Sequence, residues 1–163
     1  DCGLHFAADS QPLSKMKGIT IIAGLETLES PQELKQLVQN WGAASTVFSL
    51  DLKQGKPVRN SSSDNPYAAI DDPLEIAELS LQQGVNQMIL LDLANVGTGQ
   101  GTGTEALCRR LRSHHPDLRL ITGGGIHSRD DLQTQAEQGA DAVLVASALH
   151  DGRLGRDAVL SLS

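Results

Sequence analysis

The chain has 163 residues, 39% of them hydrophobic, and a formal net charge of −7 from 13 Lys and Arg against 20 Asp and Glu. Length and composition predict one folded domain over residues 1–163 and exclude a disordered chain. No apolar run approaches the roughly 20 residues that cross a bilayer, and an acidic chain without a basic block does not suit nucleic acid or an anionic membrane surface. We expect a cytoplasmic protein with a small-molecule partner, and backbone amides could hold a phosphorylated one despite the charge.

The cysteines and histidines show no metal-binding pattern. Cys2 and Cys108 lie far apart without a CxxC motif, so we expect two buried or idle thiols in a reducing compartment. The five histidines form no motif of the HExxH type, and we expect no metal and no cofactor. The chain starts at Asp1 instead of methionine, which indicates either a removed start or a piece of a longer chain.

Short apolar runs alternate with capped amphipathic segments along the chain. Such runs are typical of parallel strands buried on both faces, and they occur at Ile19–Ala23, Thr46–Leu50, Gln87–Leu91, Leu118–Thr122 and Ala142–Val145. Helices are predicted to begin at the capping residues Ser30, Asp72, Thr104 and Ser128, and to end near Gly42, Gly84 and Gly139. This alternation predicts an α/β fold with a parallel sheet, either open and doubly wound or part of a barrel. In both architectures the chemistry lies at the carboxyl ends of the strands.

Glycines and small residues follow the last two predicted strands. Gly123, Gly124 and Gly125 stand between a strand and a helix, where backbone N–H groups can approach a ligand closely. Ala146 and Ser147 follow the next strand, and neighbouring strand ends of this kind hold phosphate in eight-stranded barrels. A tight turn or close packing explains each element by itself, whereas the two together predict a phosphate site.

A faint internal repeat predicts a second site of the same kind. Gly3 precedes Gly24 by about the same separation as Gly124 precedes Ala146 and Ser147, and each pair leads to a strand end made of small residues. The similarity is either chance or a true repeat. A true repeat would place two phosphate cradles on opposite sides of the fold, which suits a ligand with a phosphate at each end.

Two carboxylates stand at predicted strand ends. Strand alternation places Val47, Ser49 and Asp51 on one face, with Asp51 at the carboxyl end, and Asp92 occupies the equivalent terminal place of the next strand. Such a carboxylate serves as a general acid or base when burial raises its pKa. The alternative is that each caps a loop or pairs with a lysine such as Lys53.

A glycine-rich loop, Asn95–Gly103, follows the strand that ends near Asp92. It lacks the GK[ST] ending of a nucleotide-binding P-loop and has no GxGxxG that opens a helix beside the strand. We interpret it as a loop that covers a ligand or as a source of backbone amides that face a phosphate.

Four segments, in their order and spacing, resemble the histidine-biosynthesis (HisA/HisF) barrel family: Val47–Asp51, the loop around Gly97, Ile121–Ile126 and Ala140–Gly152. The family contains a phosphoribosyl-formimino aminoimidazole carboxamide ribotide isomerase and the cyclase subunit of imidazole glycerol phosphate synthase. It is a (βα)8 TIM barrel of two similar halves, spanned by a bisphosphorylated substrate. The resemblance implies a partial barrel that starts near the end of the third strand, at Asp1, and continues through strands four to eight.

The resemblance also implies roles for individual residues. Asp51 matches one of two catalytic carboxylates, and the other belongs to a first strand that the chain does not contain. The distal phosphate site corresponds to Gly97, Gly124, Ala146 and Ser147, and the proximal site to Gly3 and Gly24. The chain departs from the family where Leu91 and Asp92 replace a usual threonine, where Val96 precedes Gly97 in place of an aspartate, and in the loop Asn60–Tyr67.

Three functions fit these observations. The first is an isomerase of a phosphoribosyl aminoaldose that uses Asp51 as acid or base. The second is a divergent family member that acts on another phosphorylated metabolite with Asp51 and Asp92 as the pair. The third is a non-catalytic phosphometabolite-binding module. We also expect unpaired sheet edges, which favour reduced stability or homo-oligomers.

Overall fold

The computed structural model describes residues 3–59, 65–99, 101–155 and 157. The predictions for Asp1, Cys2 and most of the Asn60–Asn65 loop lie outside these residues. Six strands form one sheet: β1 (Ile21–Gly24), β2 (Thr46–Lys53), β3 (Lys56–Pro57), β4 (Gln87–Asp92), β5 (Arg119–Gly123) and β6 (Ala142–Leu144). The five predicted strands are confirmed with small shifts at their ends, while the short β3 was not predicted.

The helices include four that begin directly after the predicted capping residues and a short fifth that was not predicted. They are α1 (Pro31–Trp41), α2 (Pro73–Leu81), α3 (Glu105–His114), α4 (Arg129–Glu137) and the short α5 (Ser147–His150), with three 3-10 helices at Ala7–Lys15 (η1), Ala43–Ser45 (η2) and Pro66–Ala69 (η3). The Asp72 carboxylate accepts a hydrogen bond of 2.9 Å from the N–H of Leu74, and Ser128 forms a capping box with Asp131. Thr104 precedes α3 without making a side-chain cap.

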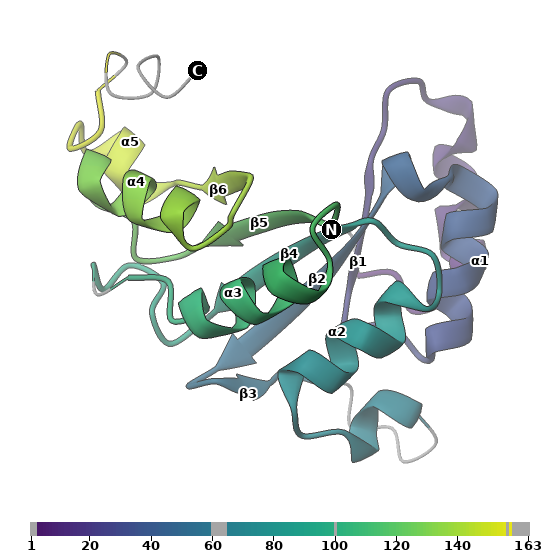
Figure 1. Ribbon diagram of the computed structural model, residues 1–163. Helices are drawn as coiled ribbons and strands as arrows, with labels where there is room; N and C mark the ends of the chain where they lie inside the picture. The colour runs from purple at the N-terminus through teal and green to yellow at the C-terminus, as the bar shows by residue number, and fades with distance from the viewer. Residues whose placement is uncertain (1–2, 60–64, 100, 156, 158–163) are drawn as a thin grey trace.

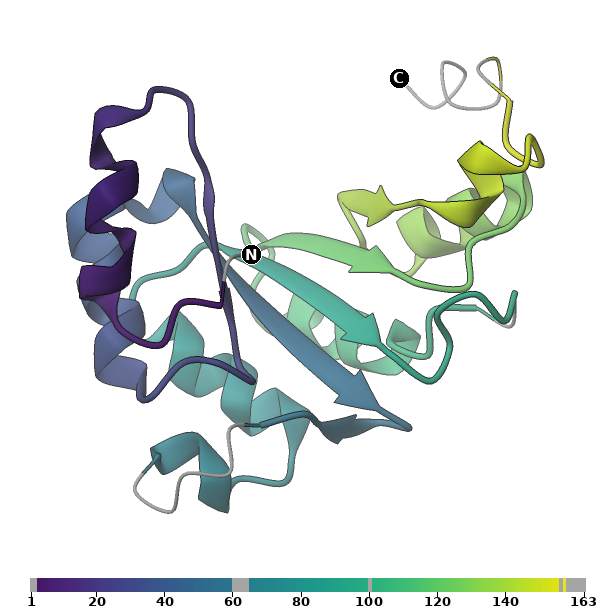
Figure 2. The same ribbon diagram turned by 180° about the vertical axis from the view of Figure 1, so that it is seen from behind.

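The strand order decides between the two predicted architectures. The order is β1-β2-β4-β5-β6, every neighbouring pair on this path is parallel, and β3 pairs antiparallel with β2. The order follows the chain without reversing, so the described strands do not form the switch point of a doubly wound fold. Figures 1 and 2 show α2 and α3 on one face of the curved sheet, α1 beside β1 and α4 beside β6. This arrangement is that of a partial (βα)8 barrel.

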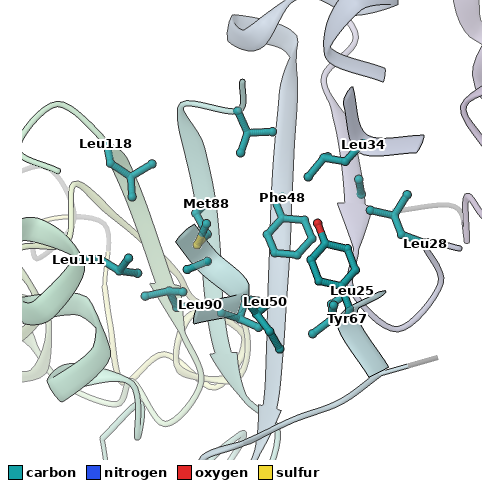
Figure 3. Packing of buried hydrophobic residues seen from close by; sticks show 14 of the residues in the cluster. Leu25, Leu28, Leu34, Phe48, Leu50, Tyr67, Met88, Leu90, Leu111 and Leu118 are labelled. Carbon is teal, nitrogen blue, oxygen red and sulfur yellow. The ribbon is translucent and has the colours of Figure 1, made fainter. Parts of the chain in front are cut away.

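The main apolar core lies between the sheet and the helices. Figure 3 shows Phe48 and Tyr67 packed together, with ring centroids 6.0 Å apart and planes 25° apart. The hydroxyl of Tyr67 makes a buried hydrogen bond of 3.0 Å with Ser80 on α2. Cys108 on α3 belongs to the same core, as predicted, and burial raises the pKa of its thiol to about 11.

The two faces of the sheet carry different side chains. Phe48 and Leu50 of β2 join the core under the helices, whereas Val47, Ser49 and Asp51 point to the other face. Among the described residues, no helix is long and apolar enough to cross a membrane.

Candidate functional site

A cavity of about 280 Å³ lies at the carboxyl ends of β4, β5 and β6. Its lining unites the strand ends and the glycine-rich loop: Leu91, Val96, Gly97, Gly124, Gly125, Ile126, Leu144, Val145, Ala146 and Ser147. Four residues of the predicted phosphate site, from three separate connections, therefore surround one space. A concave site with backbone groups from several strand ends suits a small anionic ligand.

Gly123 is the exception among the predicted phosphate residues of this region. A Cβ atom on Gly123 would lie 2.9 Å from side-chain atoms of both Leu91 and Leu144. The missing side chain lets these two leucines approach each other across β5. The structure thus gives Gly123 a packing role beneath the cavity, and it is not part of the lining.

The turn after β5 is shaped by its close contact with the glycine-rich loop. Gly125 has a φ of +67°, and a Cβ atom there would lie 2.2 Å from the carbonyl oxygen of Gly101. Glycine is the residue that tolerates both the left-handed backbone and this approach. The loop that follows β4 is therefore packed directly against the turn that lines the cavity.

A buried polar network anchors the end of this loop. Glu105 accepts hydrogen bonds from the N–H and the hydroxyl of Thr102, at 2.9 and 3.0 Å. Gln135 accepts from the hydroxyls of Thr102 and Thr122, each at 3.2 Å. Burial by itself would raise the pKa of Glu105, but the hydrogen bonds that its carboxylate receives outweigh burial and lower that pKa. The loop is thus tied to α3, α4 and β5.

Asp51 lies at the carboxyl end of β2, on the face turned away from α2 and α3. It is half-buried, and its Oδ1 accepts a hydrogen bond of 2.9 Å from the hydroxyl of Ser49. Within the described part of the chain it forms no ion pair with Lys53. The alternation that placed Val47, Ser49 and Asp51 on one face is confirmed by the register with β4, where Asp51 pairs with Leu91.

Asp92 lies on the opposite face of the sheet from Asp51. Its register partner is Leu52, one residue beyond Asp51, so the strand alternation turns it toward the helices. It is 3% exposed and accepts hydrogen bonds from the backbone N–H groups of Gln54, Gly55 and Ala94, at 3.0, 2.7 and 3.0 Å. The structure does not bring the two carboxylates together, and Asp92 holds the β2–β3 hairpin against β4.

Two side chains that the sequence did not single out lie at these strand ends. Glu26 follows β1, and its carboxylate covers Gly24, because a Cβ atom on that glycine would lie 2.4 Å from Oε1 of Glu26. His127 follows the turn after β5, and its ring packs against Gly99. A Cβ atom on Gly99 would lie 2.3 Å from Cε1 and Nδ1 of that ring. Among the described residues, Oε2 of Glu26 and Nε2 of His127 are buried without a hydrogen-bond partner. Gly99 is distant from His127 in the sequence, so no local pattern marks that contact, whereas Gly24 lies only two residues before Glu26.

The predicted proximal phosphate site is less complete than the distal one. Gly3 is exposed with a φ of +66°, and the neighbouring carbonyl of His5 accepts a hydrogen bond of 3.2 Å from the N–H of Glu29. The segment that contains Gly3 therefore runs beside the loop that follows β1. The carboxylate of Glu26, however, lies over Gly24, where the sequence predicted phosphate.

A larger cavity of about 570 Å³ lies at the opposite end of the strands. It is lined by residues that precede β4 and β5, such as Val85, Asn86 and Leu118, and by Glu78 and His115, whose Nε2 lies 2.9 Å from the glutamate. Catalytic groups of parallel α/β folds gather at the carboxyl ends of the strands, so this cavity is not the candidate site. The described residues contain no group of three or more His, Cys, Asp or Glu that could hold a metal ion.

Sequence comparison gives one family match. A family model described as "Histidine biosynthesis protein" matches residues 3–155, which is nearly the whole chain. The match includes every strand of the sheet and the cavity at its carboxyl ends.

Curated relatives are similar at 24–30% identity. A protein of Methanosphaera stadtmanae named 1-(5-phosphoribosyl)-5-((5-phosphoribosylamino)methylideneamino) imidazole-4-carboxamide isomerase is 27% identical over 150 residues, which cover 92% of this chain and 61% of the relative. A protein of the same name from Halothermothrix orenii is 30% identical over 134 residues, covering 82% of this chain and 54% of the relative. An uncharacterized protein of Methanocaldococcus jannaschii is 29% identical, with 99% and 62% covered. The chain thus spans less than two thirds of these relatives.

Proposed function

Because the chain belongs to the histidine biosynthesis protein family, we propose that it carries the phosphate-binding region and one catalytic carboxylate of an enzyme that isomerises a phosphoribosyl aminoaldose. The proposal rests on one observation above all: Gly97, Gly124, Ala146 and Ser147 line a single cavity at the carboxyl ends of the strands. The relatives named as isomerases act on a compound whose name contains phosphoribosyl groups. A phosphate held by backbone groups explains how an acidic chain can bind an anion.

Asp51 is the acid–base residue of the proposed reaction. It stands at the carboxyl end of β2, on the same edge of the sheet as the cavity. In the isomerisation, the ring C1–O bond breaks as the ring oxygen gains a proton. A proton then leaves C2 to form an enolamine. Protonation of C1 and loss of the proton from the C2 hydroxyl then give the aminoketose, with no net gain or loss of atoms. One carboxylate that accepts the C2 proton and another group that donates a proton suffice for this sequence.

The chain's context in the cell forms part of the proposal. We place the activity in the cytoplasm, in one barrel domain to which residues 1–163 contribute, and without a cofactor.

The edge strands β1 and β6 each have one neighbour on the described path of the sheet, which favours association of copies. Light scattering coupled to size-exclusion chromatography tests this, and a strictly monomeric chain over a wide concentration range would refute it.

A charge placed in the cavity tests the phosphate site. Ser147→Glu adds a carboxylate to the cavity lining, whereas Ser113→Glu adds one to an exposed position on α3. We expect ribose 5-phosphate to stabilise the wild type and Ser113→Glu in a thermal-shift titration, and to lose most of this effect with Ser147→Glu. Equal shifts in all three proteins would contradict the proposed phosphate site.

A further inference from the structure

The loop after β1 lies at the opposite side of the sheet from the cavity at β4, β5 and β6, and its contacts differ from those of the cavity. Gly24 pairs in register with Ser49, and its neighbour Ala23 pairs with Phe48 of the core. Because register partners in a sheet share a face, the side of Gly24 that lacks a side chain is the face that carries Ser49 and Asp51. The Glu26 carboxylate lies on this side, within 2.4 and 2.7 Å of the position of a Cβ atom on Gly24.

The backbone amides of this loop are already engaged. The N–H of Leu25 donates to the carbonyl of Ser49 at 3.0 Å, and those of Thr27 and Leu28 donate to the carbonyl of Gly24 at 3.1 and 3.0 Å. The N–H of Glu26 itself interacts with the carboxylate of the same residue. A phosphate needs several free N–H groups at such a strand end. Here three of the four N–H groups donate to backbone carbonyls, and the fourth faces the carboxylate of Glu26.

The charges around Glu26 also disfavour a second anion. Burial raises the pKa of the Glu26 carboxyl, its own backbone N–H acts in the opposite direction, and the charge of Asp51 raises it further. Oε2 of Glu26 is buried and has no hydrogen-bond partner among the described residues. A phosphate at Gly24 would add at least one more negative charge beside two carboxylates.

We propose that Glu26 is a specificity-determining residue, which closes the Gly24 end of the site to phosphate and restricts the substrate to compounds with a single phosphate, held in the cavity of Gly97, Gly124 and Ser147. This inference rests on the proposed function, since that cavity must hold the one phosphate. It replaces the expectation of a cradle at Gly3 and Gly24 in a ligand with a phosphate at each end. The end of the substrate at Glu26 then carries hydroxyl or amine groups that can donate to its free Oε2.

Titration with inorganic phosphate, followed by amide NMR signals, tests each end separately and does not depend on the length of a ligand. In the wild type, we expect saturable shifts for the amides of Gly124 and Ser147 and none for Gly24 and residue 26. In Glu26→Ala, which removes both the bulk and the charge, we expect the amides of Gly24 and residue 26 to shift as well, with phosphate affinity there at least about tenfold higher than in the wild type. Glu26→Gln keeps the bulk and should show a smaller gain.

Glu29→Gln is the matched control, because Glu29 lies three residues away in the same loop and contacts His5 instead of covering Gly24. It should leave the signals of Gly24 unchanged. Phosphate shifts at Gly24 in the wild type, or no new shifts there in Glu26→Ala, would overturn the inference. The absence of shifts at Gly124 and Ser147 would instead refute the proposed phosphate cavity. The restriction to a substrate whose one phosphate lies in that cavity would then fall too, even if Glu26→Ala gained phosphate binding at Gly24.

Discussion

The hydroxyl of Ser49 donates a hydrogen bond of 2.9 Å to Oδ1 of Asp51, two residues further along the same strand. The two side chains share a face because strand residues alternate, and this contact orients the carboxylate at the strand end. A general base needs such a fixed orientation toward the proton that it removes.

Asp51→Asn should abolish most of the activity while the fold is retained. The amide cannot accept a proton, so we expect kcat to fall by roughly 100-fold or more, with little change in the binding of ribose 5-phosphate. Turnover of the aminoaldose and a thermal-shift titration measure the two quantities. Ser49→Ala should reduce kcat less, because it removes only the orienting contact. Undiminished kcat in Asp51→Asn would eliminate this residue as the base.

Asp92→Asn should affect stability more than catalysis. The buried carboxylate accepts from three backbone N–H groups, and an asparagine amide would direct its own N–H groups at some of these donors. We expect a loss of about 2 kcal/mol in the free energy of unfolding, measured by urea denaturation. Residual activity at a temperature where the variant is folded should remain near that of the wild type. A stable variant without turnover would restore Asp92 to the catalytic pair.

Gly125→Ala should disrupt the cavity through a steric clash. The new methyl group would meet the carbonyl oxygen of Gly101 at 2.2 Å in addition to a strained φ. Gly152→Ala is the control, since Gly152 has a similar φ of +78° and no atom of the described residues lies within 4 Å of a Cβ atom there. The backbone strain common to both variants costs about 1–2 kcal/mol in the free energy of unfolding. We expect Gly125→Ala to lose further stability and to lose the rise in melting temperature that ribose 5-phosphate gives the wild type. Similar unfolding free energies for the two variants would show that the loop moves away easily.

Glu26→Gln should change how stability depends on pH. Burial raises the pKa of Glu26 in the folded chain above its ordinary value of 4.5, so in the range between the two values the folded state binds more protons than the unfolded state. The folded wild type therefore loses stability as pH rises through this range, and the penalty is fully present above the folded pKa. Relative to the wild type, Glu26→Gln should gain stability from pH 4 to pH 8. Glu75→Gln, at an exposed position on α2, should show no such gain. Parallel curves for wild type and Glu26→Gln would contradict the cause assigned to this shift.

Much of the fold follows from local patterns in the sequence. The apolar runs around Phe48 and Leu90 predict buried parallel strands, and Ser30 and Asp72 mark helix starts because their side chains satisfy N–H groups of the first turn. The gathering of Gly124 and Ser147 was predictable too, since carboxyl ends of parallel strands meet at one edge.

The placement of Asp92 and that of His127 depend on contacts that no local pattern contains. Both Asp51 and Asp92 end a strand, but the register pairs Asp51 with Leu91, and this offset of one residue sends Asp92 to the other face. Register is set by contacts between strands, which a single strand does not specify. The packing of His127 depends likewise on the empty side of Gly99, 28 residues earlier, whereas Glu26 lies over Gly24 only two residues away.

Even-numbered and odd-numbered residues of the central strands lie on different faces of the sheet. In β2, β4 and β5, even-numbered residues such as Phe48, Leu90 and Leu120 belong to the core under the helices. Odd-numbered ones such as Val47 and Ile89 lie outside that cluster but are buried as well, at 4% and 5% exposed. Both faces of these strands are therefore covered at these positions, and alanine substitutions should cost stability at odd-numbered as well as even-numbered residues.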